Sequence, residues 1–192
     1  MKRGFALIEA VVGIVIVLII AAIFATIFAR PRTPTGRAQC QSNLEQISLG
    51  FRQYTQDADN KFPPVQVGES NGWADVIVTY TKSTRIFQCP AAESSMPPLT
   101  DYFYNRRLSL AGMGQLKEPS QTILIGDGND NAPTWASLSQ LPSSWLTNEK
   151  SPARRHNDGA IYGFADGHAQ WLAPISVKST APQSGYSTFA LR

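Results

Sequence analysis

The chain has few of the residues, and none of the short motifs, on which most catalytic sites depend. In 192 residues it has two cysteines, Cys40 and Cys89, and two histidines, His156 and His168. Because the cysteines do not form a C-x-x-C pair, a zinc ribbon and a thioredoxin-like motif are excluded. No P-loop, G-x-S-x-G or H-E-x-x-H motif occurs, and no nucleophile stands out beside either histidine. The sequence therefore favours a protein that is not an enzyme.

Charged side chains are also scarce, at 16% of the residues, and neither sign dominates. The formal net charge is +3, and Lys2 and Arg3 supply two of these charges, which leaves +1 for the rest of the chain. A basic surface that binds nucleic acid is therefore not expected.

The longest apolar run lies near the N-terminus, and Glu9 interrupts its start. Residues 10–29 contain no charged side chain. A helix over 5–29 would be about 37 Å long, enough to cross a hydrocarbon core of about 30 Å with some tilt. A secretory signal fits poorly, because its apolar region spans only about 7–15 residues. A plain single-pass anchor leaves Glu9 unexplained, since a carboxylate in a membrane segment costs on the order of 3 kcal/mol and usually marks a function.

The stretch KRGFALIE, residues 2–9, resembles the processing signal of type IV pilins and type II secretion pseudopilins. That family has a short basic leader ending in Gly, then Phe, then Glu at the fifth mature position and a long apolar helix. The resemblance implies cleavage between Gly4 and Phe5 by a prepilin peptidase, and N-methylation of Phe5. It also implies that Glu9 pairs with the amine of a neighbouring subunit, which would make a buried carboxylate tolerable. One departure is Ala6, where the family usually has Thr.

Two prolines and an apolar stripe follow this segment. Pro31 and Pro34 predict a break over 30–36, because each removes a backbone donor and disfavours a helical residue before it. Beyond the break, apolar residues recur at steps of four and three, which predicts an amphipathic helix that ends near Asp57. The stripe comprises Cys40, Leu44, Ile47, Phe51 and Tyr54.

Short strand-like runs separated by Gly and Pro follow the second helix. Together with that helix they predict a single α+β head, in which the helix packs on a small antiparallel sheet. The expected strands are 75–80, 122–126, 160–165 and 168–172.

The expected fold is therefore pilin-like α+β, with a long N-terminal transmembrane or assembly helix ahead of the head. The resemblance implies a single-pass protein of the inner membrane, with its head in the periplasm and, after assembly, in a periplasmic or extracellular filament. The expected regions are a leader over 1–4, a transmembrane or filament-core helix over 5–29, the proline-containing break over 30–36 and the head over 37–192.

A second signature lies near the C-terminus, where nine residues separate His156 from Asp166 and Gly167. This spacing resembles the H-X9-DG element of a bacterial subset of pilin-like proteins. That subset also tends to have a Cys and NL in the second helix, a Y…FP stretch after it and a CP pair, which correspond here to CQSNL from Cys40, YTQDADNKFPP, and QCP at Cys89. The resemblance implies the fold more than a chemistry.

The Asp166-Gly167 pair predicts a two-residue type I′ turn between two strands. Ala165 should then face His168 across the turn, and alternation along each strand should gather aromatic residues on one face. That face should cover the stripe of the second helix. It comprises Tyr162, Phe164 and Trp171.

The histidines and nearby carboxylates allow two interpretations. His156, His168, Asp158 and Asp166 could form a metal site or an acid–base cluster. A structural hydrogen bond from His156 to the backbone or to a carboxylate is favoured, because only two histidines are present. The H-X9-DG element is thus expected to be a folding element.

A calcium loop is the other candidate for a bound ion. The stretch DGNDNAPTWASL places Asp127, Asn129 and Asn131 at loop positions 1, 3 and 5. It lacks the Gly at position 6 and the Glu at position 12 of an EF-hand, and ordinary turn residues explain the composition as well. No cofactor is therefore expected, with calcium as the alternative.

The two cysteines are candidates for a disulfide. Cys40 and Cys89 both lie beyond the apolar segment, on the side of the membrane where disulfides persist. A bridge would tie the second helix to the middle of the head, and the alternative is two buried thiols.

These features indicate a structural subunit of a type II secretion pseudopilus or a type IV pilus-like filament. The expected partners are copies of itself or related pilins, a prepilin peptidase and an inner-membrane assembly platform. The first alternative is a minor or tip subunit whose head binds a surface or a secreted substrate. The second, an enzyme on a membrane anchor, is disfavoured by the missing motifs.

Overall fold

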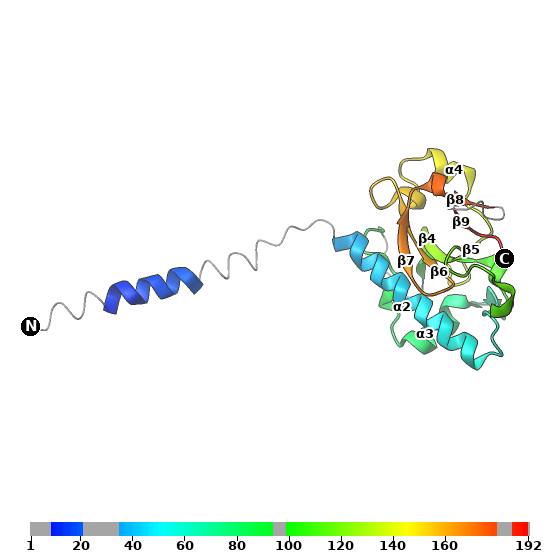
Figure 1. Ribbon diagram of the computed structural model, residues 1–192, viewed down its shortest axis with the longest axis horizontal. Helices are drawn as coiled ribbons and strands as arrows, with labels where there is room; N and C mark the ends of the chain where they lie inside the picture. Colours follow the sequence, from blue (N-terminus) through cyan, green and yellow to red (C-terminus); the bar gives the residue numbers. More distant parts are fainter. Residues whose placement is uncertain (1–8, 21–34, 94–98, 180–185, 192) are drawn as a thin grey trace, which may run out of the picture. The chain divides into compact units, whose positions relative to one another are not determined.

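A computed structural model describes residues 9–20, 35–93, 99–179 and 186–191 of the chain (Figure 1). The chain divides into two compact units, Met1–Pro34 and Thr35–Arg192, which are described separately. The leader, the proposed cleavage site at Gly4 and Phe5, and most of the break over 30–36 lie outside the described residues.

The prediction of a long N-terminal helix is wrong for the residues that the structure describes. In the first unit only residues 9–20 are described, and they are helical. At 1.5 Å per residue the described helical residues extend about 18 Å, less than the roughly 30 Å that a transmembrane helix has to cross. Among the described residues, no helix is long and apolar enough to span a membrane.

The second unit is an α+β head built on a five-stranded sheet, with strand order β5-β3-β4-β6-β7 (Figure 1). Helix α2 (Thr35–Asp57) contacts β6 and β7 on one face of the sheet, and it ends at the residue that the apolar stripe indicates. The strands are β3 (Thr100–Asn105), β4 (Ile123–Ala132), β5 (Ser137–Leu138), β6 (Ala160–Phe164) and β7 (Ala169–Leu172).

The sheet is mixed, whereas the sequence predicts an antiparallel one. Strand β5 runs parallel to β3, and the other neighbouring pairs are antiparallel. After β4 the chain reverses once, at a turn closed by a hydrogen bond from Ala136 N to Pro133 O. A strand that follows one reversal runs opposite to β4, and it is therefore parallel to β3.

The run over 75–80 is part of helix α3 (Trp73–Thr81) and not the expected strand. Its β-branched residues suggest a strand, but the carboxylate of Asp75 accepts a hydrogen bond from Gly72 N at 2.7 Å and caps a helix start. Trp73, Ala74 and Ile77 then form one buried helical face.

Short elements complete the head. They are β1 (Gln66–Val67), β2 (Asn71–Gly72), α4 (Ser143–Thr147), β8 (Val177–Lys178), β9 (Ser187–Thr188) and the 3₁₀ turns η1 (Arg85–Phe87), η2 (Arg106–Leu108), η3 (Met113–Gln115), η4 (Pro152–Arg154) and η5 (Pro174–Ser176).

Two apolar cores lie on the two faces of the sheet. The first contains the stripe of α2, with Leu44, Ile47 and Phe51 fully buried, and extends to Trp73 of α3 and Tyr104 of β3. Burying one such side chain contributes about 1.5–3 kcal/mol, so this core fixes α2 on the sheet. The second core includes Phe103, Ile123, Trp145, Tyr162, Phe164 and Phe189.

The hairpin between β6 and β7 has a three-residue loop and not the expected type I′ turn. Phe164 N donates to His168 O at 2.9 Å, and Gly167 N donates to Phe164 O at 3.0 Å. Gly167 has a φ of +103°, whereas Asp166 is not among the described residues with positive φ. This pattern is typical of a type I turn followed by a glycine bulge.

The extra loop residue shifts the register by one position. Trp171 pairs with Ile161, and Tyr162 pairs with Gln170. Since a one-residue shift moves side chains to the opposite face, Tyr162 and Phe164 lie in the second core, while Trp171 packs against the first. The expected shared aromatic face over α2 is therefore wrong.

Candidate functional site

A cluster of buried polar side chains lies between α2 and the sheet, and Asp127 is at its centre. Asp127 belongs to β4, between β3 and β6, and is fully buried. Its Oδ1 accepts a hydrogen bond from Arg155 Nη1 at 3.2 Å, and its Oδ2 accepts one from Ile161 N at 2.7 Å. Oδ2 also lies 3.4 Å from His156 Nε2. A buried carboxylate is tolerated here because an opposite charge and hydrogen bonds surround it.

A tight turn before β6 positions Arg155 and His156. His156 N donates to Gly159 O at 2.8 Å, and Asn157 and Asp158 between them have positive φ. Trp171 Nε1 donates to His156 O at 2.7 Å. A Cβ at Gly159 would lie 2.3 Å from the Trp171 ring, so only glycine fits. The HNDG stretch thus fixes the backbone from which both cluster side chains extend.

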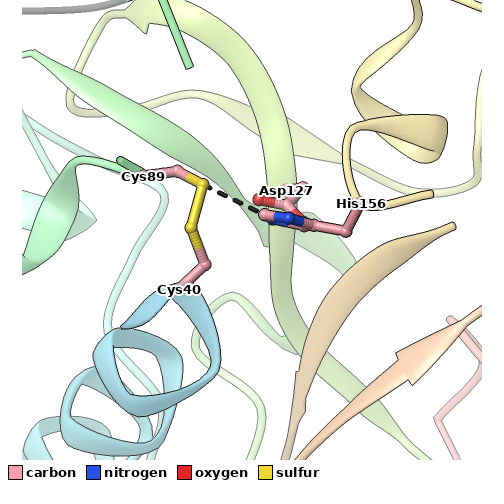
Figure 2. A group of neighbouring side chains, drawn as sticks. All are labelled: Cys40, Cys89, Asp127 and His156. Carbon is pink, nitrogen blue, oxygen red and sulfur yellow. Dashed lines mark hydrogen bonds and ion pairs between the residues drawn. A yellow bond between two sulfur atoms is a disulfide. The ribbon is translucent and has the colours of Figure 1, made fainter. Parts of the chain in front are cut away.

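A disulfide joins Cys40 of α2 to Cys89, the pair suggested by the sequence (Figure 2). His156 Nε2 lies 3.5 Å from Cys89 Sγ. Cys89 N donates to Asp101 Oδ2 at 2.9 Å, which links the loop of Cys89 to strand β3. The cluster therefore connects α2, the loop after η1 and three neighbouring strands.

Arg155 extends from the buried cluster to a surface groove. Its guanidinium also ion-pairs with Asp130 and donates to Gly128 O at 2.7 Å. The groove has a volume of about 670 Å³, and its charged lining residues are balanced in sign. These are Glu93, Asp130, Glu149, Lys150, Arg154 and Arg155.

The structure separates the four residues considered for a histidine site. His156 lies in the buried cluster, whereas His168 Nδ1 contacts Asp166 Oδ1 at 2.6 Å on the exposed hairpin loop. Asp158 pairs with Arg154 at 3.2 Å. No common site of the two histidines is thus formed within the part of the chain described.

The calcium candidates Asp127, Asn129 and Asn131 all belong to strand β4. Asp127 is committed to the cluster, Asn129 lines the groove, and Asn131 N donates to Asp101 Oδ1 at 3.0 Å. Strand β4 is irregular here, because its register with β3 shifts between Asp127 and Ala132 and Asn131 has a φ of +51°.

Sequence reasoning missed the roles of Asp101, Asp127 and Arg155. Asp127 was considered only as part of a calcium loop, and its partner Arg155 lies 28 positions away. The only local signal was the HNDG turn, which predicts a chain reversal but does not identify its neighbours.

Three fully buried tyrosines of the head have raised pKa values. Burial, and then the negative charge of Asp127, raise the pKa of Tyr102 and Tyr162, and burial raises that of Tyr104. Each hydroxyl therefore stays protonated in the folded head at a pH where it ionises in the unfolded chain, for which the usual pKa is about 10.

We expect the head to lose stability steeply above pH 10. Below pH 10 these tyrosines are protonated in both states and their contribution is constant. Above pH 10 the unfolded chain binds fewer protons than the folded head. The free energy of unfolding therefore falls by about 1.4 kcal/mol per pH unit for each tyrosine, or about 4 kcal/mol per pH unit for Tyr102, Tyr104 and Tyr162 together. Denaturant unfolding between pH 7 and 11 measures this slope.

Tyr162→Phe provides the control, because the Tyr162 hydroxyl has no hydrogen-bond partner among the described residues. The variant should be nearly as stable as the parent at pH 7 and should lose about a third of the slope above pH 10. If the stability of Tyr162→Phe falls above pH 10 as steeply as that of the parent, a raised pKa of Tyr162 does not contribute to the pH dependence.

As folded, the cluster can link segments but offers no exposed reactive group. Cys40 and Asp127 are fully buried, and His156 is 5% exposed. Comparison of the chain with family models, with curated proteins and with solved structures finds no match.

Proposed function

We propose that the chain is a structural subunit of a pilus-like filament, either a type II secretion pseudopilus or a type IV pilus-like fibre, and that a prepilin peptidase processes it. The observation that carries this proposal is the sequence KRGFALIE followed by an uncharged run over 10–29. A basic leader, Gly4, Phe5 and Glu9 occur together at the spacing that such a peptidase substrate requires.

The apolar surface of the N-terminal segment supports an assembly role. In the single chain every side chain of residues 9–20 is exposed, including large apolar ones such as Val17, which is 64% exposed. Contiguous exposed apolar surface of this kind marks an interaction site. Packing against other copies would cover it, and a neighbour's N-terminal amine would compensate Glu9.

The disulfide of the head supports a location beyond the cytoplasm. Disulfides persist in oxidising compartments such as the periplasm, and Cys40 and Cys89 are bonded in the head. The proposed subunit would therefore present its head to the periplasm or the exterior.

Glu9→Ala is expected to abolish filament formation while leaving the head folded. Removing one partner of a buried charge pair costs about 3–5 kcal/mol, which is more than a hundredfold in an association constant. Filament yield per cell, sheared and quantified against total protein, measures the effect.

Glu45→Ala is the matched control, because Glu45 is an exposed carboxylate of α2 that accepts a hydrogen bond from Gln41 Nε2. This variant should assemble normally. Equal filament yields from Glu9→Ala and Glu45→Ala would refute the pairing of Glu9 with an amine.

A further inference from the structure

Four side chains of the types that bind zinc converge beneath α2. They are Cys40, Cys89, Asp127 and His156, and all four are buried. Their sulfur, oxygen and nitrogen atoms lie within 4.8 Å of one another. Figure 2 shows the imidazole of His156 and the carboxylate of Asp127 beside the disulfide of Cys40 and Cys89.

We propose that these four side chains bind one zinc ion when Cys40 and Cys89 are thiols. Zinc in structural sites is tetrahedral, with bonds of about 2.0–2.3 Å, so neighbouring ligand atoms are about 3.3–3.8 Å apart. His156 Nε2 already lies 3.5 Å from Cys89 Sγ and 3.4 Å from Asp127 Oδ2. Two edges of the tetrahedron are thus in place. The two sulfur atoms have to separate, and the remaining pairs of ligand atoms lie within 4.8 Å of one another.

Neighbouring groups hold the ligands in position. The backbone of His156 donates to Gly159 O and accepts from the indole Nε1 of Trp171, and Cys89 N donates to Asp101 Oδ2. Arg155 pairs with Asp127 Oδ1, and Oδ2, which accepts a hydrogen bond from Ile161 N, lies 3.4 Å from His156 Nε2. Outer contacts of this kind orient the ligands of zinc sites.

The charges of the site suit a divalent cation. Two thiolates and the carboxylate of Asp127 carry three negative charges. A zinc ion neutralises two of them, and the guanidinium of Arg155, which also pairs with the partly exposed Asp130, lies against the carboxylate that carries the third. A buried site without the ion would hold uncompensated thiolates, so the thiols should stay protonated until the metal binds.

Zinc and the disulfide are alternative cross-links at one position. A newly made chain carries two thiols; on binding, each loses its proton to solvent and forms a bond to zinc. In the disulfide neither sulfur is a thiolate, so the oxidised head cannot hold the ion. A phosphine reduces the oxidised head to the thiol state by breaking the S–S bond. Water supplies the two thiol protons and the oxygen atom, and the phosphine becomes its oxide.

The test uses the full chain in detergent, with and without a phosphine, and zinc(II) as the probe. We expect the reduced chain to retain about one zinc per chain after gel filtration, and the oxidised chain to retain none above background. Cobalt(II) bound to the reduced chain should show a thiolate-to-metal charge-transfer band that is absent from Cys40→Ser.

His156→Gln and His168→Gln form the matched pair, because His168 contacts a carboxylate outside the cluster. The first should weaken zinc binding more than tenfold, and the second should leave it unchanged. The proposal is overturned if the reduced chain binds no zinc, or if both variants bind it equally, which would mean that two thiols chelate the ion without a built site. If His156→Gln does not fold, the wild-type cobalt spectrum decides, and a spectrum without the thiolate band overturns the proposal.

Discussion

Cys40→Ser is expected to lower the free energy of unfolding of the oxidised head by about 4 kcal/mol. The bridge joins residues 49 positions apart, and in the chain-entropy account closing a loop of that length in the unfolded state contributes about this amount. At a urea dependence of about 2 kcal/mol/M, the unfolding midpoint should fall by about 2 M. Urea unfolding of the full chain in detergent, with a chelator present, gives the value.

The reduced wild-type chain is the control for this variant. Without metal it should unfold at nearly the same urea concentration as Cys40→Ser, because both lack the bridge. If both cysteines of the exported protein can be alkylated without reduction after unfolding, Cys40 and Cys89 are buried thiols and no bridge forms.

Asp127→Ala should destabilise the head by about 3–5 kcal/mol. The substitution leaves Arg155 with only the partly exposed Asp130 as a charge partner and removes the acceptor of Ile161 N. Breaking a buried ion pair by removing one partner costs about this much. The same urea experiment at pH 7 measures the loss.

Asp166→Ala is the matched control, since Asp166 contacts the exposed His168 on the hairpin loop. An exposed pair of this kind contributes about 0–1 kcal/mol. Equal losses from Asp127→Ala and Asp166→Ala would show that the buried cluster does not stabilise the head.

Local patterns predicted the part of the fold that depends on short sequence distances. The α2 stripe is such a case, because Leu44, Ile47 and Phe51 repeat with the helical period and are all buried. The run over 75–80 was misjudged because its β-branched residues outweighed the capping carboxylate of Asp75. Strand propensity depends strongly on context.

In the hairpin between β6 and β7, a difference of one residue in the loop changes the pairing of every residue in the two strands. The Asp166-Gly167 pair marks the turn correctly, but the sequence does not state whether the loop has two or three residues. The third residue shifts Trp171 from Tyr162 to Ile161 and reverses which face each aromatic side chain occupies.

The buried cluster could not be predicted because its members are distant in sequence. Cys89 lies 67 positions from His156, and Asp127 lies 34 positions from its donor Ile161. These residues meet only because β3, β4 and β6 are neighbours in the sheet, and no sequence motif predicts that strand order. For the N-terminal segment, hydropathy predicts a helix over 5–29, whereas the structure describes a helix over 9–20.

Intact mass spectrometry of the protein extracted from the membranes of its native cells tests the proposed filament subunit most directly. The account predicts a single mature chain that begins at Phe5 and carries one methyl group on its amine, with Met1 to Gly4 absent. A chain that begins at Met1, or one cut after Ala29, would contradict it.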